Sequence, residues 1–154
     1  MKANTSSDTS FHKSPGVGRG ILRANALWLT IGATGGLLMD VLGIFFGHGP
    51  QSRIVTVAPH TGIAFIEAHG LALIVSILLW QVAPLRSWHF AAAAVDVLLG
   101  SANLVFWQFF VAGDMLALGY ITTSLHWLFA VLQLFAASSA PSSAFNHRSS
   151  EANA

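Results

Sequence analysis

Four long apolar runs, separated by short polar segments, dominate the pattern of the chain. They cover residues of about 21–47, 61–82, 88–111 and 115–137. Each run has roughly 22–27 residues, which exceeds the approximately 20 that a helix needs to cross a bilayer. Because a segment in lipid must satisfy its backbone hydrogen bonds internally, we expect the runs to be helices. The pattern predicts an all-α protein, an integral membrane four-helix bundle with up-down topology and short loops.

The polar segments around the runs divide the chain into a membrane domain and two tails. Residues 1–19 are rich in Ser, Gly and Lys and include Pro15, so we expect a disordered tail there. Residues 20–137 hold the four spans, and residues 138–154 are expected to form a second disordered tail. The segment 48–60, with its glycines and prolines, is expected to be a loop.

Composition excludes most soluble classes of protein. The chain has 154 residues, of which 54% are hydrophobic and only 8% are charged, whereas soluble domains carry about 25% charged residues. A soluble enzyme domain, a disordered chain and a coiled coil are therefore excluded. With a formal net charge of +1, the chain lacks the excess of positive charge that attracts nucleic acid. The absence of cysteine from the sequence excludes disulfides, thiolate metal sites, iron–sulfur clusters and thiol redox chemistry.

The basic residues predict an orientation in the membrane. Most of them fall in the tails and in the turn after the second run: Lys2, Lys13, Arg19, Arg23, Arg86 and Arg148. The two loops on the opposite side carry only Arg53 between them. Since Lys and Arg are enriched in cytoplasmic segments, both termini are expected to be cytoplasmic.

Polar side chains within the runs are the best candidates for a functional site, because ionisable groups in lipid are costly and need a partner or a purpose. Five of them are predicted to form one buried polar layer that opens toward the outer side: Asp40, Glu67, His69, Asn103 and His126. Asp96, in the cytoplasmic half, is a secondary candidate. Carboxyls buried at one level cannot all be ionised, and a nearby His can share a proton. The layer therefore predicts either a proton or ligand site, or polar contacts that only fix the helix register.

Metal and catalytic sites are not predicted. Glu67 and His69 are two residues apart and point about 200° from each other on a helix, which does not fit a di-iron bundle. No catalytic triad, phosphate-binding glycine loop or zinc motif is present, so a non-enzymatic role is favoured. No cofactor is expected, although haem remains an alternative because His69 and His126, on different helices, are residue types that bind haem iron. The remaining histidines near the span ends are expected to be solvated: His48, His60 and His89.

Small residues in the first run suggest a close helix contact. Gly32 and Gly36 are four residues apart, a spacing that lets helix backbones approach each other in lipid. Packing inside the chain is the favoured interpretation, and a homodimer through Gly32 and Gly36 is the alternative.

The second run carries a family resemblance. It reads Gly62-Ile63-Ala64-Phe65-Ile66-Glu67-Ala68-His69-Gly70-Leu71-Ala72-Leu73-Ile74. This resembles the second helix of the DoxX-like family of small bacterial membrane proteins, in which a Glu precedes a Gly-Leu-Ala-Leu-type stretch. The size and four-span layout over residues 21–137 are also similar, although His69 stands where a small residue is more usual. The resemblance implies a bacterial inner-membrane bundle, and some members of the family are tied to quinone-linked redox complexes.

The sequence thus favours a small integral membrane protein that acts as a non-enzymatic accessory subunit or binds a small molecule in its polar layer. A partner protein in the membrane is compatible with either role. Two alternatives remain: a proton-coupled transporter or channel acting as an oligomer, and a quinone- or haem-linked redox subunit.

Overall fold

The computed structural model describes residues 15–142, and this part of the chain is entirely helical apart from its connecting segments. Six helices follow one another along the chain: α1 (Pro15–Phe46), α2 (Pro50–Val57), α3 (Thr61–Gln81), α4 (Arg86–Val105), α5 (Gln108–Ala112) and α6 (Leu116–Ala137). Four of them, α1, α3, α4 and α6, are long and apolar enough to span a membrane. The all-α four-helix membrane bundle is confirmed.

Helix α1 begins earlier than the sequence analysis expected. It starts at Pro15, whereas residues 1–19 were predicted to be a disordered tail, so that prediction was wrong for residues 15–19. Proline suits the first turn of a helix because the amide hydrogen it lacks would have no intrahelical partner there. The rest of this predicted tail, and residues 143–154 of the other, lie outside the described residues.

The segment between the first two spans is not a plain loop, contrary to the prediction. It contains α2, an eight-residue helix that begins with Pro50 at its N-terminal position. Gly47 (φ 69°) and Gly49 (φ 84°) take left-handed backbone conformations that turn the chain out of α1 and into α2. Gln51 of α2 packs so closely on Gly43 of α1 that a Cβ at Gly43 would lie 2.8 Å from the Cβ of Gln51.

The predicted third span is divided in two. Helix α4 ends at Val105, and the short helix α5 follows after Phe106 and Trp107. Aromatic side chains pack together at this break: Trp107 contacts Phe110 and Tyr120 at ring-centroid distances of 5.4 and 4.8 Å. These rings fix α5 against the start of α6.

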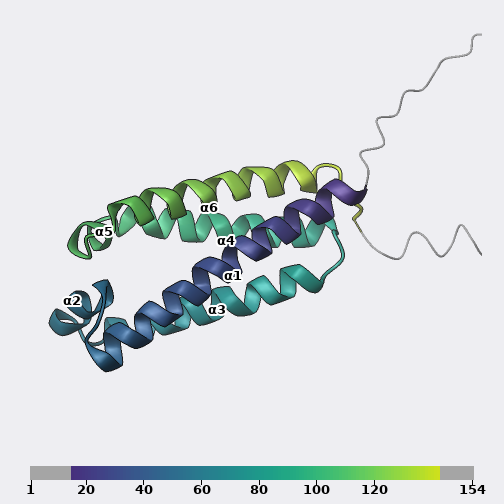
Figure 1. The fold of residues 1–154 in the computed structure, drawn as a ribbon. Coiled ribbons are helices and arrows are strands. Elements are labelled where there is room, and N and C mark those ends of the chain that lie inside the picture. The colour runs from purple at the N-terminus through teal and green to yellow at the C-terminus, as the bar shows by residue number, and fades with distance from the viewer. Residues whose placement is uncertain (1–14, 143–154) are drawn as a thin grey trace, which may run out of the picture.

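The long helices pack as two antiparallel pairs, α1 with α3 and α4 with α6 (Figure 1). The pairs meet mainly through α1 and α6 and diverge toward the end that carries α2 and α5. We call this the short-helix end, and the opposite end, where α1 begins and α6 ends, the terminal end. The apolar core lies toward the terminal end and consists of Leu22, Ala26, Leu29, Leu79 and Ala92.

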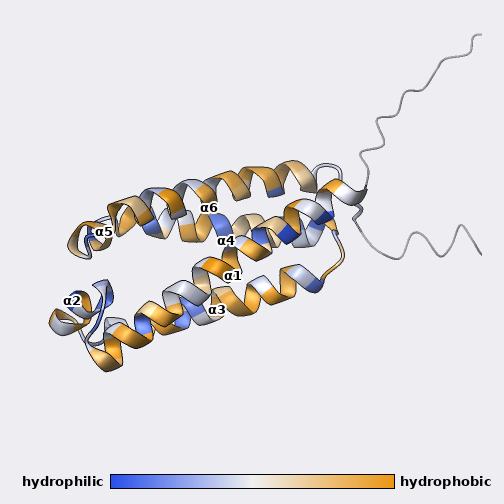
Figure 2. Ribbon diagram, in the orientation of Figure 1, coloured by the Kyte–Doolittle hydropathy of each residue, from blue (hydrophilic) through white to orange (hydrophobic). Residues whose placement is uncertain are grey.

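The outer surface of the bundle is apolar. Figure 2 shows hydrophobic residues along most of the four long helices, interrupted by few hydrophilic positions. Large side chains such as Ile31, Leu98 and Val131 are each at least 60% exposed. Soluble monomers rarely expose continuous apolar surface of this kind, so the surface is suited to contact with lipid.

Candidate functional site

A carboxyl–imidazole pair joins α1 to α3. Asp40 is completely buried, and its Oδ2 lies 2.6 Å from Nδ1 of His69, whose side chain is 32% exposed. Gly36, one turn before Asp40 on α1, makes this approach possible because a Cβ there would overlap the His69 ring. Gly36 therefore serves packing inside the chain, while Gly32 has open space at its Cβ position.

A second carboxyl–imidazole pair lies in the other half of the bundle and has an additional donor. Asp96 of α4 is completely buried, and its Oδ1 lies 3.0 Å from Nδ1 of His126 on α6. Asn25 of α1 donates a hydrogen bond from Nδ2 to Oδ2 of Asp96 at 2.6 Å. Trp28 of α1 packs edge-on against the His126 ring, with centroids 6.4 Å apart. The Asp96 cluster, composed of Asp96, Asn25 and His126, thus connects both helix pairs.

A further polar contact lies two helical turns from the Asp96 cluster, toward the terminal end. Nδ1 of His89 is 2.6 Å from Oε1 of Gln133, and both side chains are completely buried. Nε2 of His89, Nε2 of Gln133 and Oδ1 of Asn25 have no hydrogen-bond partner within the described residues. His89 was expected to be solvated, and that expectation was wrong: its place on α4 turns it toward α6 and not toward the membrane surface.

The two halves of the chain repeat the same arrangement. Each consists of a long helix, a short helix and a second long helix, and in each the first long helix carries an Asp-Val-Leu triplet, at Asp40 and at Asp96. The paired histidine follows 29 residues later in the first half and 30 residues later in the second. A buried polar residue comes seven positions after each histidine: Ser76 and Gln133. The sequence analysis missed this repeat, whose only signals are the triplet and the Asp-to-His spacing.

The structure brings some of the predicted residues together and separates others. Asp40 meets His69, and His126 meets Asp96, which had been placed apart as a secondary candidate. Within the described residues, the Asn103 side chain hydrogen-bonds to Thr122, at 3.2 Å, inside the α4–α6 pair.

Glu67 lies away from these clusters. Its side chain is exposed on α3, and no described residue bonds to its carboxyl.

Several members of the polar network are neutral residues that the sequence analysis did not single out. Asn25 holds Asp96, Gln133 holds His89, and Ser76 lies 2.9 Å from the hydroxyl of Thr30 across α1 and α3. Amides and hydroxyls commonly bond between membrane helices, so their presence gave no distinctive signal.

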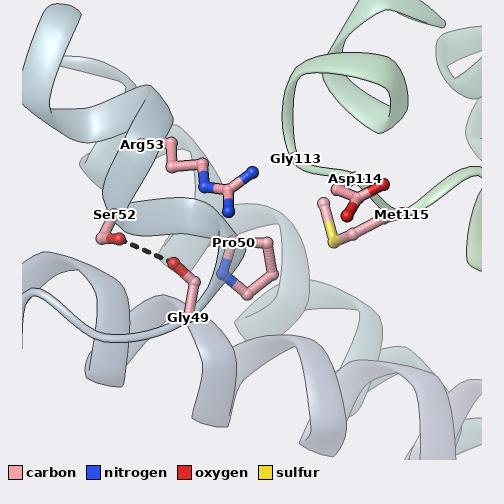
Figure 3. A pocket seen from close by; sticks show the side chains of 7 residues that line it. All are labelled: Gly49, Pro50, Ser52, Arg53, Gly113, Asp114 and Met115. Carbon is pink, nitrogen blue, oxygen red and sulfur yellow. Dashed lines mark hydrogen bonds between the residues drawn. The ribbon is translucent and has the colours of Figure 1, made fainter.

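An open pocket of about 500 Å³ lies at the short-helix end, between α2 and the turn before α6. Figure 3 shows Arg53 and Asp114 extending into it from opposite sides. Asp114 has a left-handed backbone conformation (φ 56°), which Asp tolerates better than most residues. The pocket is separate from both Asp–His pairs.

No protein-family model matches the chain, and neither the curated proteins nor the solved structures contain a match.

Proposed function

We propose that this chain is a non-enzymatic membrane bundle that binds protons at its buried Asp–His pairs, with the Asp96 cluster as the principal site. The observation that carries the proposal is the position of Asp96, which is completely buried and bonded to both helix pairs through Asn25 and His126. A carboxyl and an imidazole in direct contact form a unit that can take up and release a proton.

Charge accounting explains why that proton matters. The pair of Asp96 and His126 carries one negative charge when the carboxyl is ionised and the imidazole is neutral. It is neutral overall when it holds one more proton. Among the described residues, the side chains that bond to the pair or pack on its ring are Asn25 and Trp28, and neither carries a charge. The dielectric constant inside a membrane span is low, so adding or removing one charge appreciably changes the interaction energy between the pair and the helices around it.

The two Asp–His pairs differ in what their protons would affect. Asp40 and His69 both belong to the α1–α3 pair, so a proton there acts within one helix pair. The Asp96 cluster connects α1 with α4 and α6, so a proton there acts on the contact between the pairs. This arrangement supports a role in which protonation of Asp96 changes how the two helix pairs are held together.

The test is infrared difference spectroscopy of the purified full-length protein in lipid, recorded between acidic and neutral pH. We expect a carboxyl band that depends on pH and disappears in Asp96→Asn. The Asn side chain keeps the size of Asp but has no titrating proton. Asp114→Asn is the matched control, because it removes an exposed loop carboxyl outside the bundle interior.

The Asp114→Asn spectrum should retain the band assigned to Asp96. If Asp96→Asn folds and leaves the pH-dependent carboxyl bands unchanged, the buried cluster does not exchange protons in this range and the proposal fails. Helical circular dichroism of each variant establishes that it is folded.

His89 Nε2 and Gln133 Nε2 lie about two helical turns from Asn25 Oδ1, so these atoms form two separate positions, each of which a water molecule or a carbonyl or hydroxyl group of a quinone could engage. Solvent extraction of the purified protein followed by mass spectrometry would detect a bound quinone. A visible spectrum would detect haem, and a protein that yields neither argues for water at these atoms.

The cellular setting is part of the same proposal. The described ends of α1 and α6 lie at one end of the bundle together with Arg19, Arg23 and Arg86, which supports cytoplasmic termini. The resemblance of α3 to the DoxX-like family supports a bacterial inner membrane and a role as an accessory subunit beside a larger enzyme. Reporter fusions at both termini would test the orientation.

A further inference from the structure

Two side chains of opposite charge face the pocket at the short-helix end. Arg53 extends into it from α2 and Asp114 from the turn before α6, so the two belong to different halves of the repeat (Figure 3). Both residues are exposed, and neither side chain forms an ion pair or a hydrogen bond with another residue among 15–142. The pocket therefore presents one cation and one anion, both available to a ligand.

Hydrogen bonds within the two turns hold the walls of the pocket in place. On the α2 side, the Ser52 hydroxyl donates to the backbone oxygen of Gly49 at 2.6 Å (Figure 3). On the other side, the backbone amide of Met115 donates to the carbonyl of Phe110 at 2.8 Å, and Gly113 leaves room for the Met115 side chain, since an added Cβ would lie 2.6 Å from its Cε. The open space between the walls, about 500 Å³, is within the range of about 300–1,000 Å³ that is typical of ligand pockets.

The pocket lies at the level of the lipid headgroups. At this end the first span finishes at Phe46 and the second begins at Thr61, while the last begins at Leu116. Residues 49–53 and 113–115, which supply the lining of the pocket, lie just outside these spans. The headgroups of a bilayer occupy the polar layer on each side of its apolar core. A lipid headgroup and a small molecule from the aqueous phase can therefore both reach the pocket.

The two charges select the chemical class of the ligand. A simple anion would be repelled by Asp114 and a simple cation by Arg53, whereas a zwitterion is complementary to both. The planar guanidinium of Arg53 suits a phosphate, and the carboxylate of Asp114 suits a primary ammonium, which donates up to three hydrogen bonds. A quaternary ammonium has no N–H to donate and is usually held by aromatic rings, but none of the seven residues that line the pocket is aromatic.

We propose that this pocket binds a phosphoethanolamine group, with the phosphate on Arg53 and the ammonium on Asp114. Because Arg53 belongs to the first half of the repeat and Asp114 to the second, the bound group bridges the two halves at the end where the helix pairs diverge (Figure 1). The proposal does not rest on proton binding at the Asp96 cluster, from which the pocket is separate.

Lipid retention by the purified full-length protein tests the proposal. After exchange in detergent with equal amounts of phosphatidylethanolamine and phosphatidylcholine, native mass spectrometry should detect several-fold more of the ethanolamine lipid on the protein. Arg53→Gln and Asp114→Asn should each reduce this preference several-fold, while Arg19→Gln, which removes an exposed arginine at the terminal end, is the matched control and should preserve it. Equal retention of the two lipids, or a preference that persists in Arg53→Gln, would overturn the proposal.

Free O-phosphoethanolamine, which is the headgroup without acyl chains, distinguishes the two sources of the ligand. If it displaces the ethanolamine lipid from the protein, the pocket recognises the headgroup alone and accepts a soluble zwitterion. If the lipid preference persists in its presence, the ligand is the lipid. Asp96→Asn should leave the preference unaltered, so failure of proton binding at the Asp96 cluster and failure of the pocket to bind its ligand are seen in separate experiments.

Discussion

Gly36→Ala provides a sharp test of the packing between α1 and α3. A Cβ at this position would meet three atoms of the His69 ring, and even the farthest of them, Cε1, would be 2.7 Å away. Ordinary carbon contacts begin at about 3.5 Å, so the ring must move by at least about 0.8 Å. The Asp40–His69 contact is 2.6 Å. If the ring moves away from Asp40 by that amount, the separation between Nδ1 of His69 and Oδ2 of Asp40 becomes longer than the upper hydrogen-bond distance of about 3.2 Å.

Loss of this contact leaves Asp40 buried without a partner among residues 15–142. A hydrogen bond to a charged group contributes about 1.5–3 kcal/mol to stability. Gly32→Ala is the matched control because it lies one turn earlier on the same helix and its Cβ would meet nothing within 4 Å. Both substitutions gain the same helix propensity, so the difference between them isolates the clash. We expect Gly36→Ala to be less stable than Gly32→Ala by about 1.5–3 kcal/mol.

The assay is denaturant unfolding in detergent micelles, followed by circular dichroism. A double-mutant cycle with His69→Ala assigns the cause, because the Gly36→Ala penalty should disappear once the ring is absent. Equal stability of the two glycine variants, or a penalty that persists in His69→Ala, would refute the reasoning. Either result would instead favour the alternative in which Gly36 contacts another molecule.

Other contacts lead to further predictions. Asn25→Ala removes the amide donor to Asp96 and should lower the free energy of unfolding by about 2 kcal/mol. Asn103→Ala, which removes a neutral hydrogen bond to Thr122, should lower it by about 1 kcal/mol or less, and equal losses would contradict the importance of the Asp96 cluster. Gly119→Ala should displace Phe110, whose Cγ lies 2.7 Å from the added Cβ, and accelerate amide hydrogen exchange in α5, with Gly16→Ala as an unaffected control. Arg23 lies 5.3 Å from the Trp80 ring centroid, so a double-mutant cycle of Arg23→Gln and Trp80→Leu should give a coupling energy of less than about 1 kcal/mol. A coupling well above that value would require a further partner for Arg23.

The number and positions of the spans could be predicted because they depend on length and composition alone. Predicted spans of 61–82 and 115–137 agree closely with α3 and α6. Helix α2 and the break before α5 could not be predicted in this way, since both depend on tertiary contacts: Gln51 against Gly43, and the rings around Trp107.

The partners of the buried acids were harder to predict than the acids themselves. In lipid, the outward face of a helix is as apolar as the inward face, so periodicity does not reveal where a side chain points. Glu67 and His69 are close in sequence, yet one faces outward and the other faces α1. Asn25 is far in sequence from Asp96, and only the packing of α1 against the α4–α6 pair brings the two together.

The three acids within the spans occupy three distinct environments, and this separates their roles. Asp40 is bonded inside one helix pair, Asp96 is bonded across both pairs, and Glu67 faces away from the bundle. Loss of the first carboxyl should therefore loosen α1 from α3, and loss of the second should loosen the two pairs from each other. Loss of the third should leave the fold of one chain intact, because no residue among 15–142 bonds to the Glu67 carboxyl.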